Sequence, residues 1–496
     1  YMPLTKYILF NNWLRAGLSL ANAVFFAMGW LNFWSLLALS VVSAFQFSTL
    51  FVTDTANMTA LVGKDKKRIR ATEALIRIAT IAVTVASGLF LGEHIITALG
   101  FMWTFVIVAA LQFIPVFIQW WTLPSIGSRN SWSFAGIRDA VRGFFSRLGK
   151  TGEGSAEDAA AARKSALRYA LNSALIAIGL GTSFFWGTPF PLIGVMLFTL
   201  LRSDIYKNVI SKHAMLKLSL IFIMFTSMAE IPMRNSVLGA VARDAVGNPS
   251  AAAAYFGNLI AAFYMGQMPT GTGILEDDIV IKAGPVSFRL KTAAKWLGTA
   301  AFAAWSYFYL IPPGWIVAAA GAVGLSGVLP AGVLAAAGAL ITLAAAAKLY
   351  TFLHDLAPKV SDRWWMRLDV LAMLGMGLPL LAWGNPAVLF LSLFLLGLVH
   401  NPTSRTVSAA YSAESMEHAP KSMQYLAGIK SSFLNMATST MYALYGLVAS
   451  WSAGSHSSLP TWRFATGMYV LLAVALLVGS YILPFGDEKK AAEKKK

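Results

Sequence analysis

Long apolar segments alternate with short polar segments along the whole chain of 496 residues. A bilayer-spanning helix needs about 20 apolar residues, because each residue advances the helix by about 1.5 Å. Two of the segments do not fit the length of one spanning helix. Residues 189–202 form a segment that is too short, and residues 315–347 form a long segment that contains Pro330. The pattern predicts an all-α polytopic membrane protein with about 12–14 transmembrane helices. The predicted spans are residues 7–29, 31–53, 72–92, 97–121, 168–187, 189–202, 214–237, 251–272, 293–312, 315–347, 366–384, 386–403, 422–450 and 462–485.

The composition agrees with a membrane protein. Hydrophobic residues make up 57% of the chain and charged residues 12%, whereas roughly a quarter of a soluble globular chain is charged. The mean hydropathy is +0.63. The chain contains no cysteine, which excludes disulfides and thiolate metal sites.

The formal net charge of +17 is spread unevenly over the connections between spans. Every second connection is rich in lysine and arginine, whereas the connections between them contain Arg243 as their single cation. By the positive-inside rule, the basic connections and both termini are expected to be cytoplasmic. Anionic lipid headgroups on that face are the expected counter-charge, so a nucleic-acid partner is not needed. The basic connections are residues 64–70, 129–168, 202–217, 282–295, 348–367, 405–421 and the tail 486–496.

The longest polar segment, residues 122–167, is predicted to form a cytoplasmic amphipathic helix on the membrane surface, followed by a flexible Gly/Ser/Glu/Ala linker. This segment separates an early group of spans from the rest. The predicted divisions are a partial N-terminal bundle at 1–121, the surface helix and linker at 122–167, an extra hairpin and connector at 168–213, a C-terminal bundle at 214–485 with an inserted hairpin near 293–347, and a charged tail at 486–496.

A pattern of span, polar connector and span occurs twice in the chain. Residues 52–88 align without a gap with residues 403–439, and Leu75 then matches Leu426. Few residues are identical, so the repeat is one of pattern and length. Repeats of this kind are typical of transporter halves related by an axis along the membrane normal.

Three stretches resemble helices of the major facilitator superfamily. The third family helix is represented by "TKYILFNNWLRAGLSLANAVFF", and the fourth helix with the connector after it by "ALSVVSAFQFSTLFVTDTANMTALVGKDKKRIRATEAL". Their counterparts in the second half are represented by "GLVHNPTSRTVSAAYSAESMEHAPKSMQYL". The closest resemblance is to its bacterial efflux-type branch. The Asp-Arg-x-Gly-Arg signature of that family is represented in "KVSDRWWMRL" by Asp362, Arg363 and Arg367, without its glycine. These three residues are therefore candidates for cytoplasmic gating charges, and the alternative is that they only set the topology.

This resemblance implies a two-bundle fold in a bacterial inner membrane. The spans from 7–29 to 97–121 would be the third to sixth family helices, and the spans from 366–384 onward would be the ninth to twelfth. The first two family helices would then be missing. Since the chain begins with Tyr1 and its first span has no signal-peptide cleavage site, we expect a fragment whose beginning is absent.

Motifs of common enzyme and metal sites are not found in the sequence. No two of the 6 histidines have the spacing of a metal motif. The tripeptide "GKT" at 149–151 lacks the first glycine of a P-loop, and no GxSxG motif occurs. We therefore expect no metal, no cofactor and no enzymatic activity.

Two charged residues stand inside the apolar span 214–237. In "SMAEIPMRNS", Glu230 and Arg234 are spaced i, i+4 and flank Pro232. That spacing places both charges on one helix face, and charged residues inside a membrane are usually paired and functional. The pair is either a structural ion pair or part of a central cavity, where Glu230 would couple transport to protons and Arg234 would tune it or bind an anionic substrate group.

Other polar residues at membrane depth are further candidates for substrate or ion contact. A stripe on span 422–450 includes Lys430 and Asn435, which face either a neighbouring helix or a cavity. Arg15 either snorkels to the interface or faces the site. Span 251–272 carries Tyr255, Asn258 and Gln267, for which close packing through nearby glycines is the alternative.

Two classes of function agree with these observations. The first is a secondary active transporter that moves a small molecule by alternating access and is coupled to an ion, in this case H⁺, with efflux as the expected direction. The second is a polytopic membrane enzyme or scaffold that handles lipid-linked intermediates. The absence of clustered Asp, His or Arg in the non-cytoplasmic loops favours the transporter.

Overall fold

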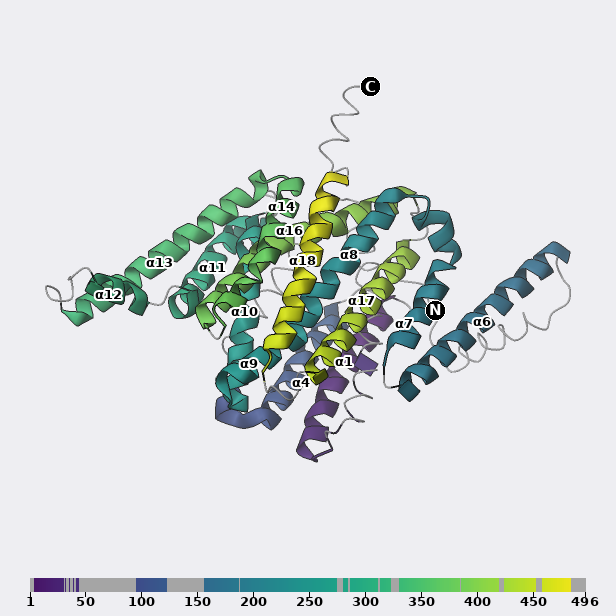
Figure 1. Ribbon diagram of the computed structural model, residues 1–496, viewed down its shortest axis with the longest axis horizontal. Coiled ribbons are helices and arrows are strands. Elements are labelled where there is room, and N and C mark those ends of the chain that lie inside the picture. Colours follow the sequence, from purple (N-terminus) through teal and green to yellow (C-terminus); the bar gives the residue numbers. More distant parts are fainter. Residues whose placement is uncertain are drawn as a thin grey trace, which may run out of the picture. The chain divides into compact units, whose positions relative to one another are not determined.

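The computed structural model describes most of the chain between residues 4 and 482, and almost all of the described residues are helical (Figure 1). The spans predicted at 31–53 and 72–92, the repeat at 52–88 and the amphipathic part of 122–167 lie wholly or largely outside the described residues. The described residues are 4–30, 32, 35, 39, 42–43, 95–122, 156–186, 188–273, 280–283, 286–310, 313–322, 330–383, 385–418, 423–451 and 457–482.

The helices follow the apolar segments of the sequence. Three of the short elements, η2 (Tyr206–Ile210), η3 (Met233–Val237) and η4 (Ser306–Leu310), are π-helical, and η6 (Ala357–Lys359) is a 3₁₀ turn. The α-helices are α1 (Leu4–Ala27), α4 (Ile96–Thr122), α6 (Ala156–Trp186), α7 (Phe190–Leu201), α8 (Ala214–Pro232), α9 (Leu238–Val246), α10 (Pro249–Gly273), α11 (Leu290–Trp305), α12 (Pro313–Ala322), α13 (Ala331–Leu356), α14 (Asp362–Gly375), α15 (Leu378–Leu381), α16 (Pro386–His418), α17 (Met423–Trp451) and α18 (Leu459–Ile482).

Five of the described helical stretches are long and apolar enough to cross a bilayer. They agree with the predicted spans that begin at residues 214, 315, 366, 386 and 462. This part of the prediction, a helical integral membrane protein, is therefore confirmed, whereas the total number of spans stays a prediction. The stretches are Ala214–Val246, Ala331–Lys359, Asp362–Leu381, Pro386–Ser408 and Leu459–Tyr481.

Several predicted boundaries are wrong. The span predicted at 315–347 is two helices, α12 and α13, and Pro330 is the N-cap residue of the second. A proline is tolerated at a helix start but not in its interior, because it has no N–H to donate. The predicted linker is helical from Ala156 onward, since its alanine-rich end has a high helix propensity.

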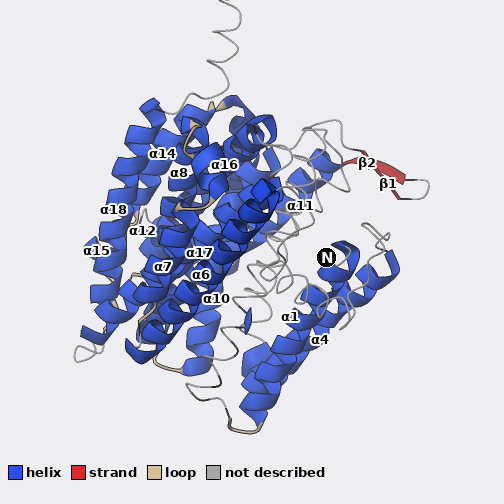
Figure 2. Cartoon of the chain, turned by 90° about the vertical axis from the view of Figure 1, so that its right-hand side faces the viewer, coloured by secondary structure: helices blue, strands red, loops and turns tan. Residues whose placement is uncertain are grey.

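The predicted cytoplasmic connections are also shorter than expected. Helix α16 continues through residues 405–418, which were predicted to be a connection. The connection at 282–295 contains two antiparallel strands, β1 (Val280–Ala283) and β2 (Val286–Arg289), with Val280 opposite Arg289. Strand β2 leads directly into α11 (Figure 2). Apart from this hairpin, the described elements are helices, as expected for an all-α membrane protein.

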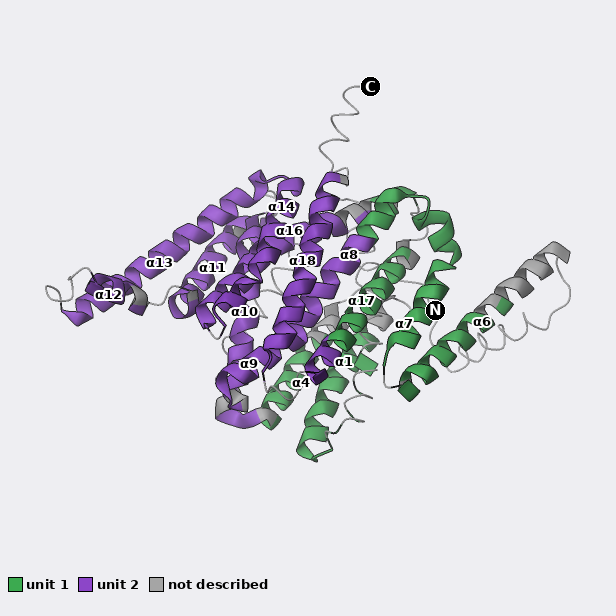
Figure 3. Ribbon diagram, viewed as in Figure 1, with its two compact units in different colours: residues 1–61, 101–220, 414–444 green, residues 62–100, 221–413, 445–496 purple. Residues whose placement is uncertain are grey.

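The chain divides into two compact units, drawn in two colours in Figure 3. Unit 1 contains residues 1–61, 101–220 and 414–444, and unit 2 contains residues 62–100, 221–413 and 445–496. In unit 1, α1 packs on α4 through Trp13, whose ring lies 5.5 Å from Phe113. The domain boundaries expected from the sequence stay predictions.

Unit 2 contains the more heavily buried helices. Helix α14 packs along α18, and α10 packs against α9, α11 and α13. Aromatic side chains fill the space between α11 and α16, where Trp305 stacks on Phe394 with 5.9 Å between ring centroids. Helix α8 is joined to α18 by a hydrogen bond from the Tyr469 hydroxyl to the Ala229 carbonyl. The charged residues of unit 2 lie among α8, α10, α14 and α16.

Candidate buried charge network

The Glu230–Arg234 pair predicted from the sequence is present in unit 2. Arg234 Nη1 lies 3.2 Å from Glu230 Oε1, one turn apart on the same helix. The helix changes from α to π form between them, because η3 begins at Met233, directly after Pro232. Pro232 cannot donate a backbone hydrogen bond, and π segments within helices are frequent at functional sites. The ion pair is confirmed, and its role stays a prediction.

A residue of α10 extends the pair on the arginine side. Arg234 Nη1 donates a hydrogen bond of 2.8 Å to the hydroxyl of Tyr264. The guanidinium also lies 5.6 Å from the centre of the Tyr264 ring, which is within cation–π range. Tyr264 therefore fixes the position of the guanidinium that faces Glu230.

A histidine extends the pair on the glutamate side. His400 of α16 places Nε2 3.4 Å from Glu230 Oε2, an ion-pair distance, and Nδ1 3.0 Å from Oδ2 of Asp369 on α14. An ionised carboxylate only accepts hydrogen bonds, so the Nδ1 proton points to Asp369 when that carboxylate is charged. We refer to Asp369, His400, Glu230, Arg234 and Tyr264 as the buried charge network.

Burial changes steadily along this network. The side chains of Asp369 and His400 are 0% and 3% exposed, whereas those of Glu230 and Arg234 are 16% and 22% exposed. Removing a charge from water is expensive unless an opposite charge and hydrogen bonds replace the water. The network contains two carboxylates and one guanidinium, so a protonated His400 makes its charges balance.

Close helix packing holds His400 in place. A Cβ added at Gly397 of α16 would lie 1.9 Å from the carbonyl oxygen of Phe263, and one added at Gly266 of α10 would lie 2.1 Å from the carbonyl oxygen of Phe394. Each helix thus has a glycine where the backbone of the other passes. Small residues at such crossings allow membrane helices to approach closely, and the packing explanation for span 251–272 is confirmed at Gly266.

Pro402 of α16 leaves one backbone acceptor without its helical partner. The carbonyl of Leu398, four residues earlier, would normally accept from the N–H at position 402, which proline lacks. Thr270 of α10 donates its hydroxyl to this carbonyl over 3.1 Å. Asn401 Nδ2 donates in turn to the carbonyl of Gln267, at 3.4 Å. These side chains fix α16 against α10 on both sides of His400.

The three candidates on α10 have different surroundings. Gln267 is fully buried at the α10–α16 crossing, where its carbonyl accepts from Asn401. Tyr255 is half-buried and packs edge-on against Phe390, with 5.8 Å between ring centroids. Asn258 is buried. Gln267 is thus a packing residue next to the network, and a role of Tyr255 or Asn258 in substrate contact stays a prediction.

The remaining predicted substrate residues belong to unit 1. Lys430 and Asn435 are half-buried on α17, and Arg15 is exposed on α1. The exposure of Arg15 agrees with the snorkelling interpretation. A role of these three residues in substrate or ion contact stays a prediction.

The predicted gating residues lie at the start of α14, seven residues or fewer before Asp369. Asp362 is exposed and accepts a 3.0 Å hydrogen bond from the Thr406 hydroxyl of α16. Arg367 packs over Trp364 and over Tyr481 of α18, at 5.3 and 5.0 Å from the ring centroids. Arg363 is half-buried. Asp362 and Arg367 thus tie α14 to α16 and α18 within unit 2, and a role in gating stays a prediction.

Asp369, His400 and Tyr264 were not predicted from the sequence. A signal for the first two was present, because each stands inside a predicted span and ionisable residues are costly there. His400 also precedes Asn401 and Pro402, and such an interruption of an apolar run marks a helix with special backbone contacts. Tyr264 gave no signal of its own, since tyrosine is common in membrane helices.

No protein family, curated protein or solved structure matches this chain. Among the described residues, no group of three or more His, Cys, Asp or Glu side chains is arranged to hold a metal ion.

Proposed function

We propose that this chain is a secondary active transporter that moves a small molecule across the membrane by alternating access, coupled to protons through the buried charge network. The observation that carries the proposal is the position of His400 between two carboxylates, on helices of membrane-spanning length. Ionisable residues inside a membrane are rare, and they mark proton relays and ion pathways.

The proton step follows from the distances. A proton on Oε2 of Glu230 moves to Nε2 of His400, 3.4 Å away, which leaves a glutamate carboxylate and an imidazolium. The carboxylates of Glu230 and Asp369 then face the imidazolium from both sides, and Arg234 also faces Glu230. Loss of the proton through the more exposed Glu230–Arg234 end leaves two carboxylates against one guanidinium. The net charge of the network thus changes by one when the proton binds or leaves.

This change of charge acts on helix packing. Glu230, Asp369 and His400 come from α8, α14 and α16, so their attraction differs between the two protonation states. Pro232 with η3, and Pro402 in α16, are points where these helices can bend without losing further backbone hydrogen bonds. A proton can therefore bias the equilibrium between two arrangements of the helices, which is the requirement for coupled transport.

The resemblance of the sequence to the major facilitator superfamily supports the same proposal. It gives the proposed two-bundle fold, a location in a bacterial inner membrane with both termini cytoplasmic, and efflux as the direction. Under this proposal the chain has no enzymatic activity and needs no cofactor, and its partners are a small-molecule substrate, protons and anionic lipids.

The test is flux in proteoliposomes that contain the full chain, with and without a proton gradient, over a panel of amphipathic drugs, siderophores, lysolipids and sugars. Glu230→Gln should retain expression and substrate exchange but abolish gradient-driven flux, because glutamine cannot carry the proton. Glu417→Gln is the matched control, since Glu417 is exposed at the far end of α16. It should transport like the original chain.

Two results would contradict the proposal. Absence of flux for every class in the panel would favour the membrane enzyme or scaffold. Loss of expression in Glu230→Gln, with recovery in a double variant with Arg234→Met, would show that the pair is structural and has no part in coupling.

A further inference from the structure

The buried charge network ends at the Glu230–Arg234 pair on one side and at Asp369 on the other. Oδ2 of Asp369 faces His400, whereas Oδ1 is buried and has no hydrogen-bond partner among the described residues. Helix α14, which carries Asp369, packs along α18 (Figure 1). A transporter that works by alternating access exchanges its coupling ion with each side of the membrane in turn. The end at Asp369 is therefore the place to look for a second proton route.

Tyr469 of α18 lies beside this end of the network. Its side chain is buried, and its hydroxyl donates over 3.4 Å to the carbonyl of Ala229, the residue before Glu230. The hydroxyl also interacts electrostatically with Glu230, Asp369 and Arg234. A distance of 3.4 Å is long for a hydroxyl hydrogen bond. The hydroxyl can therefore turn to another partner at little cost.

A second tyrosine lies near Tyr469. Tyr445 of α17 is buried, and its ring packs edge-on against Phe464 of α18, with 5.3 Å between ring centroids. Its hydroxyl interacts electrostatically with Tyr469 and has no hydrogen-bond partner within the part of the chain that the structure describes. A buried hydroxyl is costly unless it is hydrogen-bonded, and ordered water commonly supplies the bond to such groups.

The buried face of α18 continues these polar groups toward the first turn of the helix. Ser458, Trp462 and Tyr469 are spaced i, i+4 and i+11, which places them on one face. They are 4%, 1% and 1% exposed. Ser458 Oγ and Trp462 Nε1 make no hydrogen bond to any described residue. Polar groups with unused hydrogen-bonding capacity thus extend over about 16 Å of the helix, at about 1.5 Å per residue.

An acidic residue lies where this face reaches the start of α18. The carboxylate of Asp244, near the end of α9, accepts a hydrogen bond from the backbone N–H of Ser458. Its side chain is 19% exposed, and that of the neighbouring Arg243 is 76% exposed, so water reaches the carboxylate. The connection before α18 is among those that the sequence predicts to be non-cytoplasmic.

We infer that the buried polar face of α18, together with Tyr445, forms a water-bridged proton path from Asp244 to Asp369. The inference rests on the proposed function and gives the same network a second access, from the face opposite the cytoplasm. Carboxylates, hydroxyls and ordered water are the groups from which buried proton-transfer chains are built.

The proton step follows from the imidazolium state of the network. Nδ1 of His400 passes its proton over 3.0 Å to Asp369, which leaves a neutral imidazole and a carboxylic acid. The acid releases the proton to the Tyr469 hydroxyl, which gives its own proton to the next acceptor and so remains neutral. Trp462 only donates a hydrogen bond to water, because its ring nitrogen cannot accept. Each step is reversible, so the same path also delivers a proton to the network.

The test compares gradient-driven flux with substrate exchange in proteoliposomes that contain the full chain, using the panel compound that it transports. Tyr469→Phe should slow gradient-driven flux about tenfold, the effect expected for the loss of one hydrogen bond from the path. Exchange and the melting temperature should stay unchanged, because exchange needs no net proton movement and the ring is kept. Tyr445→Phe should act in the same direction.

A double variant tests whether the two hydroxyls act in series. Tyr469→Phe with Tyr445→Phe should be little slower than the slower single variant, because both interrupt one path. Tyr481→Phe is the matched control, since Tyr481 is 68% exposed near the end of the same helix. It should transport like the original chain.

The outcomes separate this inference from the proposed function. If Glu230→Gln abolishes gradient-driven flux while both tyrosine variants transport like the original chain, the path is wrong and the proposed function stands. If exchange falls in proportion to gradient-driven flux in Tyr469→Phe, the tyrosine is structural and the path is also wrong. If the original chain shows no gradient-driven flux, the proposed function fails and the path fails with it.

Discussion

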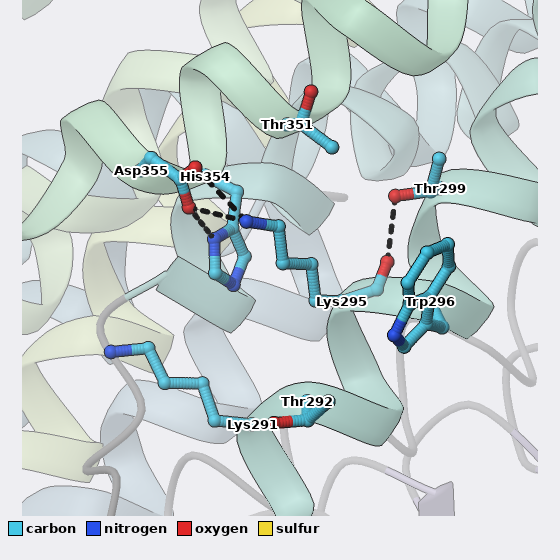
Figure 4. A pocket seen from close by; sticks show the side chains of 8 residues that line it. All are labelled: Lys291, Thr292, Lys295, Trp296, Thr299, Thr351, His354 and Asp355. Atoms are coloured by element: carbon cyan, nitrogen blue, oxygen red, sulfur yellow. Dashed lines mark hydrogen bonds and ion pairs between the residues drawn. The ribbon is translucent and has the colours of Figure 1, made fainter.

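The buried charge network and the cluster of His354, Asp355 and Lys295 on α13 and α11 (Figure 4) both contain a histidine beside a carboxylate. His400 and His354 are both buried. Their partners differ, since Asp369 is fully buried whereas the side chain of Asp355 is 53% exposed. The charged partners differ as well, because two carboxylates face one guanidinium in the network, whereas Asp355 is paired with the ammonium of Lys295.

This difference gives the two sites different chemistry. A buried excess of negative charge is neutralised by a proton, which needs no cavity to hold it. In the second cluster the ammonium of Lys295 already balances the carboxylate of Asp355. Burial also sets how much stability is lost when a charged partner is removed, because water can replace a lost partner at Asp355 but not at Asp369.

The largest expected effect is the removal of the buried histidine. His400→Gln should lower the free energy of unfolding by about 3–5 kcal/mol, since it leaves Asp369 as a buried charge without a cation. Thermal unfolding in detergent measures the change. Asp369→Asn in the same chain should recover part of the loss, and a double variant no more stable than His400→Gln alone would show that the two residues are not coupled.

Glycine substitutions should have the next largest effect. Gly397→Ala pushes a methyl group against the backbone of Phe263, which cannot move aside, and should cost about 3 kcal/mol. Gly298→Ala is the matched change on α11. The Cβ that it adds would lie 1.9 Å from the hydroxyl of Tyr350, at the end of a side chain of α13. Its cost should fall when Tyr350→Phe removes that hydroxyl. Equal melting temperatures for both alanine variants would contradict the comparison.

A smaller effect is expected at the exposed end of the network. Tyr264→Phe removes the hydrogen bond to Arg234 but keeps the ring, so the loss should be about 1 kcal/mol. Denaturant titration of the purified chain measures it. In an Arg234→Met background the same substitution should be close to neutral, and an unchanged cost there would assign the effect to another partner of Tyr264.

The smallest effect is expected at the partly exposed Lys295–Asp355 pair. Lys295→Gln with Asp355→Asn should change stability by about 0.2–1 kcal/mol, because water screens this pair and holding two long side chains costs entropy. A double-mutant cycle on the melting temperature isolates the interaction. A coupling energy as large as that between His400 and Asp369 would remove the distinction between the two sites.

The sequence by itself determined the class of the protein and the local relation of Glu230 to Arg234. Both depend on short-range rules, the length of apolar runs and the period of the helix, which need no knowledge of neighbouring segments. The same rules placed the start of α8 and the start of α16 where they are observed, but they joined α12 and α13 into one span. They failed at the ends of α6 and α16, where helix-forming polar residues continue a helix beyond its apolar part.

Only the tertiary structure decided which charges meet. Asp369 and His400 are 31 residues apart, and the contact of His400 with Glu230 depends on how α16 packs against α8. The glycines at the α10–α16 crossing fix the approach of those two helices to within the size of a methyl group. Such distances are set by side chains from several helices at once, so no spacing along one segment of the chain encodes them. The Lys295–Asp355 pair arises in the same way, because these two residues meet only after α11 and α13 have packed.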